Sequence, residues 1–189
     1  MTSRPVILEQ IWDFAVPKSI DDSQRWVLAA MQSHGQQLVG MLWRILGNEQ
    51  DVCDAYQDTF LRLAHLEGGQ KPENVKAYVF RSASNIAISI LRRKISEKNG
   101  LASTVPVSRD VTSPQNELDA EYLRDALRCS IARLPENLRD VVSLHDLGDL
   151  SYIQVGKILG ITAATARVYR CRAIQLLSVW MGRKKDGIL

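Results

Sequence analysis

The stretch SYIQVGKILGITAATARVYRCRA, residues 151–173, predicts a helix-turn-helix. Ser151 can cap a short first helix with Gln154 as its capping-box partner. Gly160 can adopt the left-handed backbone that ends this helix. Thr162 can then cap a second helix, which begins after only a short turn. The two helices are therefore expected to cross steeply, as they do in this motif.

The predicted second helix has two different faces. Gly156 in the first helix allows the second to cross it closely, and the apolar side that packs there comprises Ala166, Tyr169, Ala173, Leu177 and Trp180. The opposite side carries Ala164, Arg167, Val168, Cys171 and Gln175, flanked by Arg172. A helical hairpin with no ligand shows a similar pattern, but the arginines and turn residues favour a helix that reads a DNA major groove.

The charge of the chain is small overall but strongly segregated. The net charge is +3, whereas residues 49–60 hold four acids without a base and residues 151–189 hold seven bases against one acid. The three cysteines and three histidines are scattered, so we expect no disulfide framework, metal site, catalytic group or cofactor. No apolar run reaches the roughly 18 residues of a membrane span, which predicts a soluble, cytoplasmic protein.

Helical periodicity in the remaining segments predicts an all-α fold of two small helical domains joined by a flexible linker. Helices are expected over residues 26–46, 51–66 and 75–94, and again over 118–134 and 138–148. Residues 96–116 lack periodicity and are rich in Gly, Ser, Thr and Pro. The predicted divisions are an N-terminal extension (1–24), a first domain (25–95), the linker (96–116), a second domain (117–182) and a basic tail (183–189). The extension could pack on the first domain or dock on another protein, and both interpretations stay open.

The helix over 51–66 has an acidic outer stripe with one leucine, formed by Asp51, Asp54, Gln57, Asp58 and Leu61. Such a stripe is typical of a solvated face, but a leucine among carboxylates also suits docking on a basic protein surface. The pattern of this helix does not choose between the two.

The helix over 75–94 has a polar and basic outer face, formed by Tyr78, Arg81, Ser82, Asn85, Ser89 and Arg92. Arginine can neutralise phosphate, asparagine can pair with a base edge and tyrosine can stack on a base. Arg93 and Lys94 continue the positive charge. An ordinary solvated basic face remains the alternative.

Taken together, the residues resemble the extracytoplasmic-function (ECF) group of bacterial RNA polymerase sigma factors. The resemblance rests on three segments in order, DAYQDTFLRL (54–63), AYVFRSASNIAISILRRK (77–94) and LPENLRDVVSLHDLGDLSYIQVGKILGIT (134–162) followed by TARVYRCRA. It implies a transcription initiation factor that binds core RNA polymerase, recognises promoter DNA with both domains and helps to melt it. An anti-sigma factor is a common further partner in that group, and whether this chain has one stays open.

The resemblance also implies roles for individual residues. Core polymerase would be bound by Asp51, Asp54, Gln57, Asp58 and Leu61. The minus-ten promoter element would be bound by Asn74, Lys76, Tyr78, Arg81, Asn85, Arg92 and Arg93. The minus-thirty-five element would be bound by Thr162, Ala164, Thr165, Arg167, Val168, Cys171 and Arg172. The chain departs from the family pattern at Arg170, where a leucine usually packs, at Tyr78, where tryptophan is common, and at Ala166, which replaces a bulkier valine.

Two other functions fit parts of the sequence. A stand-alone regulator could use the same helix-turn-helix, with the first domain sensing or dimerising. A helical enzyme or adaptor is the second alternative, but the sequence holds no paired acids, nucleophile with a base, or phosphate loop.

Overall fold

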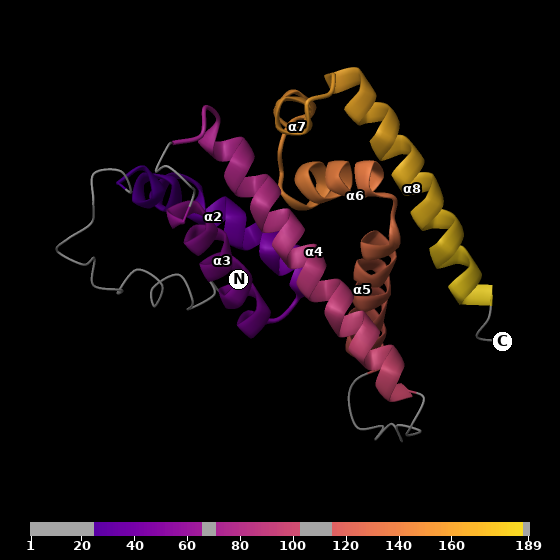
Figure 1. The fold of residues 1–189 in the computed structure, drawn as a ribbon. Coiled ribbons are helices and arrows are strands. Elements are labelled where there is room, and N and C mark those ends of the chain that lie inside the picture. The colour runs from indigo at the N-terminus through magenta and orange to yellow at the C-terminus, as the bar shows by residue number, and fades with distance from the viewer. Residues whose placement is uncertain (1–24, 66–70, 103–114, 187–189) are drawn as a thin grey trace.

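The computed structural model describes residues 25–65, 71–102 and 115–186, and every regular element in these ranges is a helix (Figure 1). The predicted all-α fold is therefore confirmed. No helix in the described part of the chain is long and apolar enough to cross a membrane.

Three helices make the first domain: α2 (Arg25–Leu46), α3 (Glu49–Ala64) and α4 (Val75–Ala102). Their apolar faces meet in a core whose most deeply buried side chains include Leu38, Met41, Leu42, Ile45 and Phe80. The turn between α2 and α3 is short because Asn48 caps α3, its side chain accepting a hydrogen bond from the Asp51 amide. These helices and their core faces follow the predicted periodicity.

The second domain consists of α5 (Gln115–Arg133), α6 (Glu136–Val142), the π-helical segment η3 (Ser143–Leu147), α7 (Tyr152–Leu159) and α8 (Ala163–Asp186). The helix-turn-helix forms with the predicted caps. The Ser151 hydroxyl accepts from the Gln154 amide at 3.3 Å, and the Gln154 side chain accepts from the Ser151 amide at 2.9 Å. Gly160 ends α7 with φ of 69°, and Thr162 caps α8.

The helix ends differ from the prediction on both sides of the expected linker. Helix α4 continues to Ala102 and α5 already begins at Gln115, so residues 96–102 and 115–116 are helical. A helix can outlast its apolar periodicity because its backbone hydrogen bonds need no buried face, and pairs such as Arg93–Glu97, at 3.8 Å, support an exposed turn. Residues 103–114 lie outside the described part of the chain.

The two domains pack against each other, which the sequence analysis did not predict. Helix α4 runs diagonally with α3 on one side and the second domain on the other (Figure 1). A continuous apolar cluster joins the first-domain core to Val141, Leu144, Leu150 and Val155 of the second domain. Ile88 of α4 is also buried in this cluster.

Candidate nucleic-acid interface and docking surface

Helix α3 presents most of its predicted outer stripe to solvent. Asp54, Gln57, Asp58 and Leu61 are exposed, and we call these four residues the outer stripe of α3. Leu61 is 55% exposed although it is a large apolar side chain. The four residues share one face because they are spaced three or four apart in the helix. The stripe therefore offers an exposed leucine about one turn beyond two carboxylates.

Asp51 does not belong to this stripe, and its predicted exposure was wrong. The residue is only 7% exposed, and its carboxylate pairs with Lys94 Nζ at 2.5 Å. Asn48 donates a second hydrogen bond to the same carboxylate. Burial alone would raise the pKa of Asp51, but the hydrogen bonds from Lys94 and Asn48 outweigh it and lower this pKa. Asp51 thus joins the start of α3 to α4 instead of facing solvent.

Helix α4 presents Tyr78, Arg81, Asn85 and Arg92 on the side away from the first-domain core, and we call these residues the outer face of α4. All four count as exposed, with Tyr78 at 37%. An aromatic ring, an amide and two guanidinium groups thus follow one helical line over four turns. This combination can stack on bases, pair with base edges and neutralise phosphates.

Two predicted minus-ten residues that precede this face, Asn74 and Lys76, make contacts within the first domain. Asn74 caps α4, because its side-chain oxygen accepts a hydrogen bond from the Ala77 amide at 3.0 Å. Lys76 is half-buried, with Nζ 5.5 Å from the centre of the Phe80 ring. Arg93 is exposed beyond the end of the outer face of α4.

Arg92 departs from the prediction that the outer face of α4 is open along its length. Its Nε and Nη2 both donate to the carbonyl oxygen of Ala132 in α5, at 3.0 and 2.9 Å. Arg81 also acts on the second domain. Burial raises the pKa of Asp140 in α6, and the charges of Arg139 and then Arg81 oppose that rise. The second domain thus lies against one flank of the outer face of α4.

Helix α8 exposes the predicted side of the helix-turn-helix. Ala164, Arg167, Val168, Cys171 and Arg172 all face solvent, and we call them the outer face of α8. Val168 is 48% exposed. The predicted packing side is confirmed as well, since Ala166 and Ala173 are fully buried. The first turn is fixed by Thr162 and Thr165, whose hydroxyls lie 2.8 Å apart while Thr162 also accepts from the Thr165 amide.

Exposed charged helix faces are the main surface features of the described part of the chain. Among the described residues, no group of three His, Cys, Asp or Glu side chains is arranged to hold a metal ion. Two exposed basic helices on separate domains, and an acidic stripe on a third helix, are instead the features that stand out. The second of these basic helices belongs to a helix-turn-helix with confirmed caps.

Comparison with known families assigns both domains. Residues 30–96 match the model for sigma-70 region 2, and residues 124–177 match the model for sigma-70 region 4. The chain belongs to the sigma-70 family. Its relatives place it in the ECF group. They include the ECF RNA polymerase sigma factor SigW of Bacillus subtilis, 25% identical over 144 residues that make up 70% of this chain and 77% of the relative.

A second relative covers more of this sigma factor. The ECF RNA polymerase sigma-E factor of Haemophilus influenzae is 25% identical over 177 residues, which are 87% of this chain and 93% of the relative. Among solved structures, CnrH in complex with the cytosolic domain of CnrY shares the fold, with a TM-score of 0.52 and 20% identity over 85% of this chain and 90% of that chain.

The sigma factor is accordingly a transcription initiation factor that directs RNA polymerase to promoters. The stand-alone regulator considered above is not favoured, because both domains match sigma regions and the relatives are ECF sigma factors. The predicted family and function are confirmed.

Sequence reasoning missed the contacts that fix the rotation of α8 in this sigma factor. Arg170 binds both carboxylate oxygens of Asp146 through Nε, at 2.8 and 3.0 Å, and through Nη2 at 2.6 Å. His145 stacks on Tyr152 with ring centres 4.0 Å apart, and Arg167 lies 5.2 Å from the same tyrosine ring. The signal in the sequence was Arg170 itself, a cation where the family usually packs a leucine.

Proposed function

We propose that this sigma factor divides its contacts among three surfaces. The outer stripe of α3 docks on core RNA polymerase, the outer face of α4 binds the minus-ten element, and the outer face of α8 reads the minus-thirty-five element. The observation that carries the proposal is the exposure of one acidic stripe and two basic faces on three different helices. Surfaces of opposite charge on separate helices suit partners of opposite charge.

The outer stripe of α3 has the chemistry of a protein-docking surface. Asp54 and Asp58 can meet basic side chains of a partner, and Leu61, about one turn beyond Asp58, can bury apolar area in the same contact. Charges at the rim of an interface mainly guide association, whereas a desolvated apolar residue at its centre carries more of the affinity. We therefore expect Leu61 to contribute more to affinity than either carboxylate.

The outer face of α4 suits a single-stranded element better than a duplex. Tyr78 can stack on an unpaired base, Asn85 can hydrogen-bond its edge, and Arg81 can hold the backbone. Opening a base step costs a few kcal/mol, which stacking and phosphate contacts can offset. Asn74, Lys76 and Arg93 extend this contact at the two ends of the face. The sigma factor would thus melt DNA by binding the open strand, without catalysing a reaction.

The outer face of α8 suits the major groove. The N-terminal half of a recognition helix meets base edges in this motif, and Arg167, Val168 and Arg172 lie there on the exposed side. Arginine can bind guanine through two hydrogen bonds, and Val168 can contact a thymine methyl group. Thr162, Ala164 and Thr165 at the start of the helix, with Cys171 one turn on, complete the proposed contact.

The first experiment measures binding to purified core RNA polymerase. Asp58→Lys and Leu61→Ser should each weaken binding by about tenfold or more, because they remove a charge pair or the apolar centre. Glu121→Lys is the matched control, since it makes the same charge reversal at an exposed position of α5. Equal affinity of all three variants and the unchanged protein would contradict the docking role of α3.

The second experiment measures transcription from a promoter library by core polymerase with each sigma variant. Tyr78→Ala should reduce strand opening, detected by permanganate reactivity of unpaired thymines. Arg167→Ala should instead change which minus-thirty-five sequences are preferred and cost about 1–3 kcal/mol at the affected base. A change of minus-thirty-five preference in Tyr78→Ala with none in Arg167→Ala would reverse the assignment of the two faces.

Two further expectations belong to this proposal. A factor that works on RNA polymerase acts in the cytoplasm. The resemblance to the ECF group also makes an anti-sigma factor a partner to be tested, with co-purification from the native host as the measurement.

A further inference from the structure

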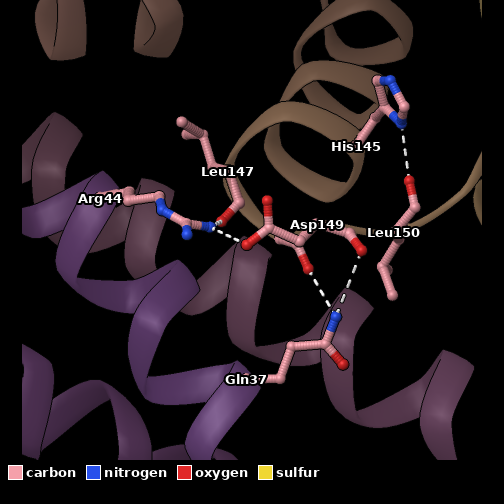
Figure 2. Close-up of polar contacts among 7 residues, drawn as sticks. Gln37, Arg44, His145, Leu147, Asp149 and Leu150 are labelled. Carbon is pink, nitrogen blue, oxygen red and sulfur yellow. Dashed lines mark hydrogen bonds and ion pairs between the residues drawn. The ribbon is translucent and has the colours of Figure 1, made fainter.

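The end of segment η3 points its last carbonyl groups at helix α2 of the other domain (Figure 2). Gln37 Nε2 donates to the carbonyl oxygen of Gly148 at 2.8 Å, and Arg44 Nη1 donates to that of Leu147 at 2.6 Å. The carbonyls of a last helical turn lack partners within the helix, and the end of the helix carries partial negative charge. Helix α2 supplies an amide donor and a cation where both are needed.

Asp149 completes the contact and has an uncommon backbone. Its φ is 53°, in the left-handed region where glycine is favoured. No other non-glycine residue in the described part of the chain has a positive φ. Its carboxylate pairs with Arg44 Nη1 at 2.5 Å (Figure 2). A glycine would fit the backbone with less strain but could not form this ion pair. The aspartate therefore adds a charged contact to α2 at a position that only a few residue types tolerate.

A second group of contacts joins the first domain to helix α5 of the second domain. Arg92 donates twice to the Ala132 carbonyl oxygen, and Arg128 Nε donates to the Arg44 carbonyl oxygen at 3.2 Å. The approach is close, since a Cβ placed on Gly148 would lie 3.1 Å from Met41 Sδ. Side chains of α2 and α4 thus satisfy backbone carbonyls of the second domain, and a side chain of α5 satisfies a carbonyl of α2.

From these contacts we propose that Gln37, Arg44 and Asp149 form a latch that holds the free sigma factor closed. In the closed state Arg92 is engaged by α5, whereas the outer stripe of α3 and the outer face of α8 remain exposed. Polymerase can therefore dock while the latch is shut. Opening then frees Arg92 and the flank of α4 for the minus-ten element. This last step rests on the proposed role of α4, but the latch itself does not.

The ion pair of the latch is exposed to solvent, so it is weak enough to break. The side chains of Arg44 and Asp149 are 46% and 62% exposed, so water and salt compete for their ion pair. The apolar cluster shared by the domains supplies attraction without direction, and the latch fixes how they meet. We expect loss of the latch to shift the closed–open equilibrium toward open by about five- to tenfold, leaving each domain folded.

The experiment measures the distance between spin labels on the two domains of the full chain. One label is placed on the native Cys171 and one on Ser33→Cys of α2, with Cys53 and Cys129 replaced by serine; Cys171 and Ser33 are exposed. The unchanged latch should give one narrow distance distribution in the free protein. Arg44→Gln and Asp149→Asn should each add a longer, broad component. Asparagine tolerates the left-handed backbone, so Asp149→Asn tests the charge alone.

A matched control and a double variant make the result decisive. Arg62→Gln, the same change at an exposed position of α3, should leave the distribution unchanged. The double variant Arg44→Gln with Asp149→Asn should open the protein less than the two single effects combined, because both remove one ion pair. Distributions that are the same in the unchanged and latch variants would overturn the proposal, as would an open distribution in the unchanged free protein.

Adding core polymerase separates this proposal from the proposed function. The latch predicts that polymerase lengthens the distance in the unchanged protein. Failure to bind polymerase would contradict the docking role of α3 while the free-protein distances still tested the latch. Binding without any lengthening would show that the latch does not respond to polymerase and would overturn the opening step.

Discussion

Replacing Gly156 by alanine tests the close crossing that forms the helix-turn-helix. A Cβ at Gly156 would lie 2.6 Å from the Ile161 carbonyl oxygen and 3.4 Å from the Ala163 amide nitrogen. Both neighbours are backbone, and the turn is drawn over Gly156 by hydrogen bonds from the Gly160 and Ile161 amides to its carbonyl oxygen. The turn must therefore move by about 0.8 Å, from 2.6 Å to an ordinary contact of 3.4 Å.

The size of the effect follows from two opposing contributions. Overpacking of this kind costs about 1–3 kcal/mol, while alanine gains about 1 kcal/mol over glycine inside a helix. We expect Gly156→Ala to lower the free energy of unfolding by up to about 2 kcal/mol, the difference between the two. It should also reduce transcription from promoters that depend on the minus-thirty-five element, because α8 is displaced.

Urea unfolding followed by circular dichroism measures the change, and Gly40→Ala is the control. Gly40 lies inside α2, and nothing lies within 4 Å of a Cβ added there. This variant should gain about 0.5–1 kcal/mol from helix propensity alone. If Gly156→Ala were as stable as Gly40→Ala, the close crossing would not limit the residue at position 156 and the reasoning would be refuted.

Three more predictions concern packing, charge and capping. A Cβ on Gly35 would lie 2.9 Å from the buried Tyr56 hydroxyl oxygen, so Gly35→Ala should destabilise the protein but become stabilising in a Tyr56→Phe background, which a double-mutant cycle by thermal unfolding can measure. The lowered pKa of Asp51 means that its pair with Lys94 stabilises the fold above the unfolded pKa of about 3.8 and is lost as pH falls through the lower folded value. Once both curves are set to equal stability at neutral pH, acid unfolding should therefore begin at higher pH in the unchanged protein than in Asp51→Asn, and coincident pH profiles would contradict the pairing. Ser151→Ala should cost about 1 kcal/mol by removing a capping hydrogen bond, whereas Ser151→Asp should cost little in the same urea assay.

The sequence alone determined the local features of this sigma factor. The caps at Ser151 and Thr162, the left-handed turn at Gly160 and the buried side of α8 all follow from residues within a few positions of one another. Such features depend on helix geometry, which repeats every three to four residues and can be traced along a chain. The division into outer and core faces of α3 and α4 is predictable for the same reason.

Only the tertiary structure decided which exposed residues are used within the protein. Asp51 turned inward because α4 brings Lys94 beside it, and Arg92 found the Ala132 carbonyl oxygen on the other domain. Arg44 likewise meets Asp149, 105 positions later in the chain. Helical periodicity states which side of a helix is polar but not which distant carbonyl or charge will face it. Those partners are set by how the helices and the two domains pack, and that packing holds α4 and α8 in one closed body.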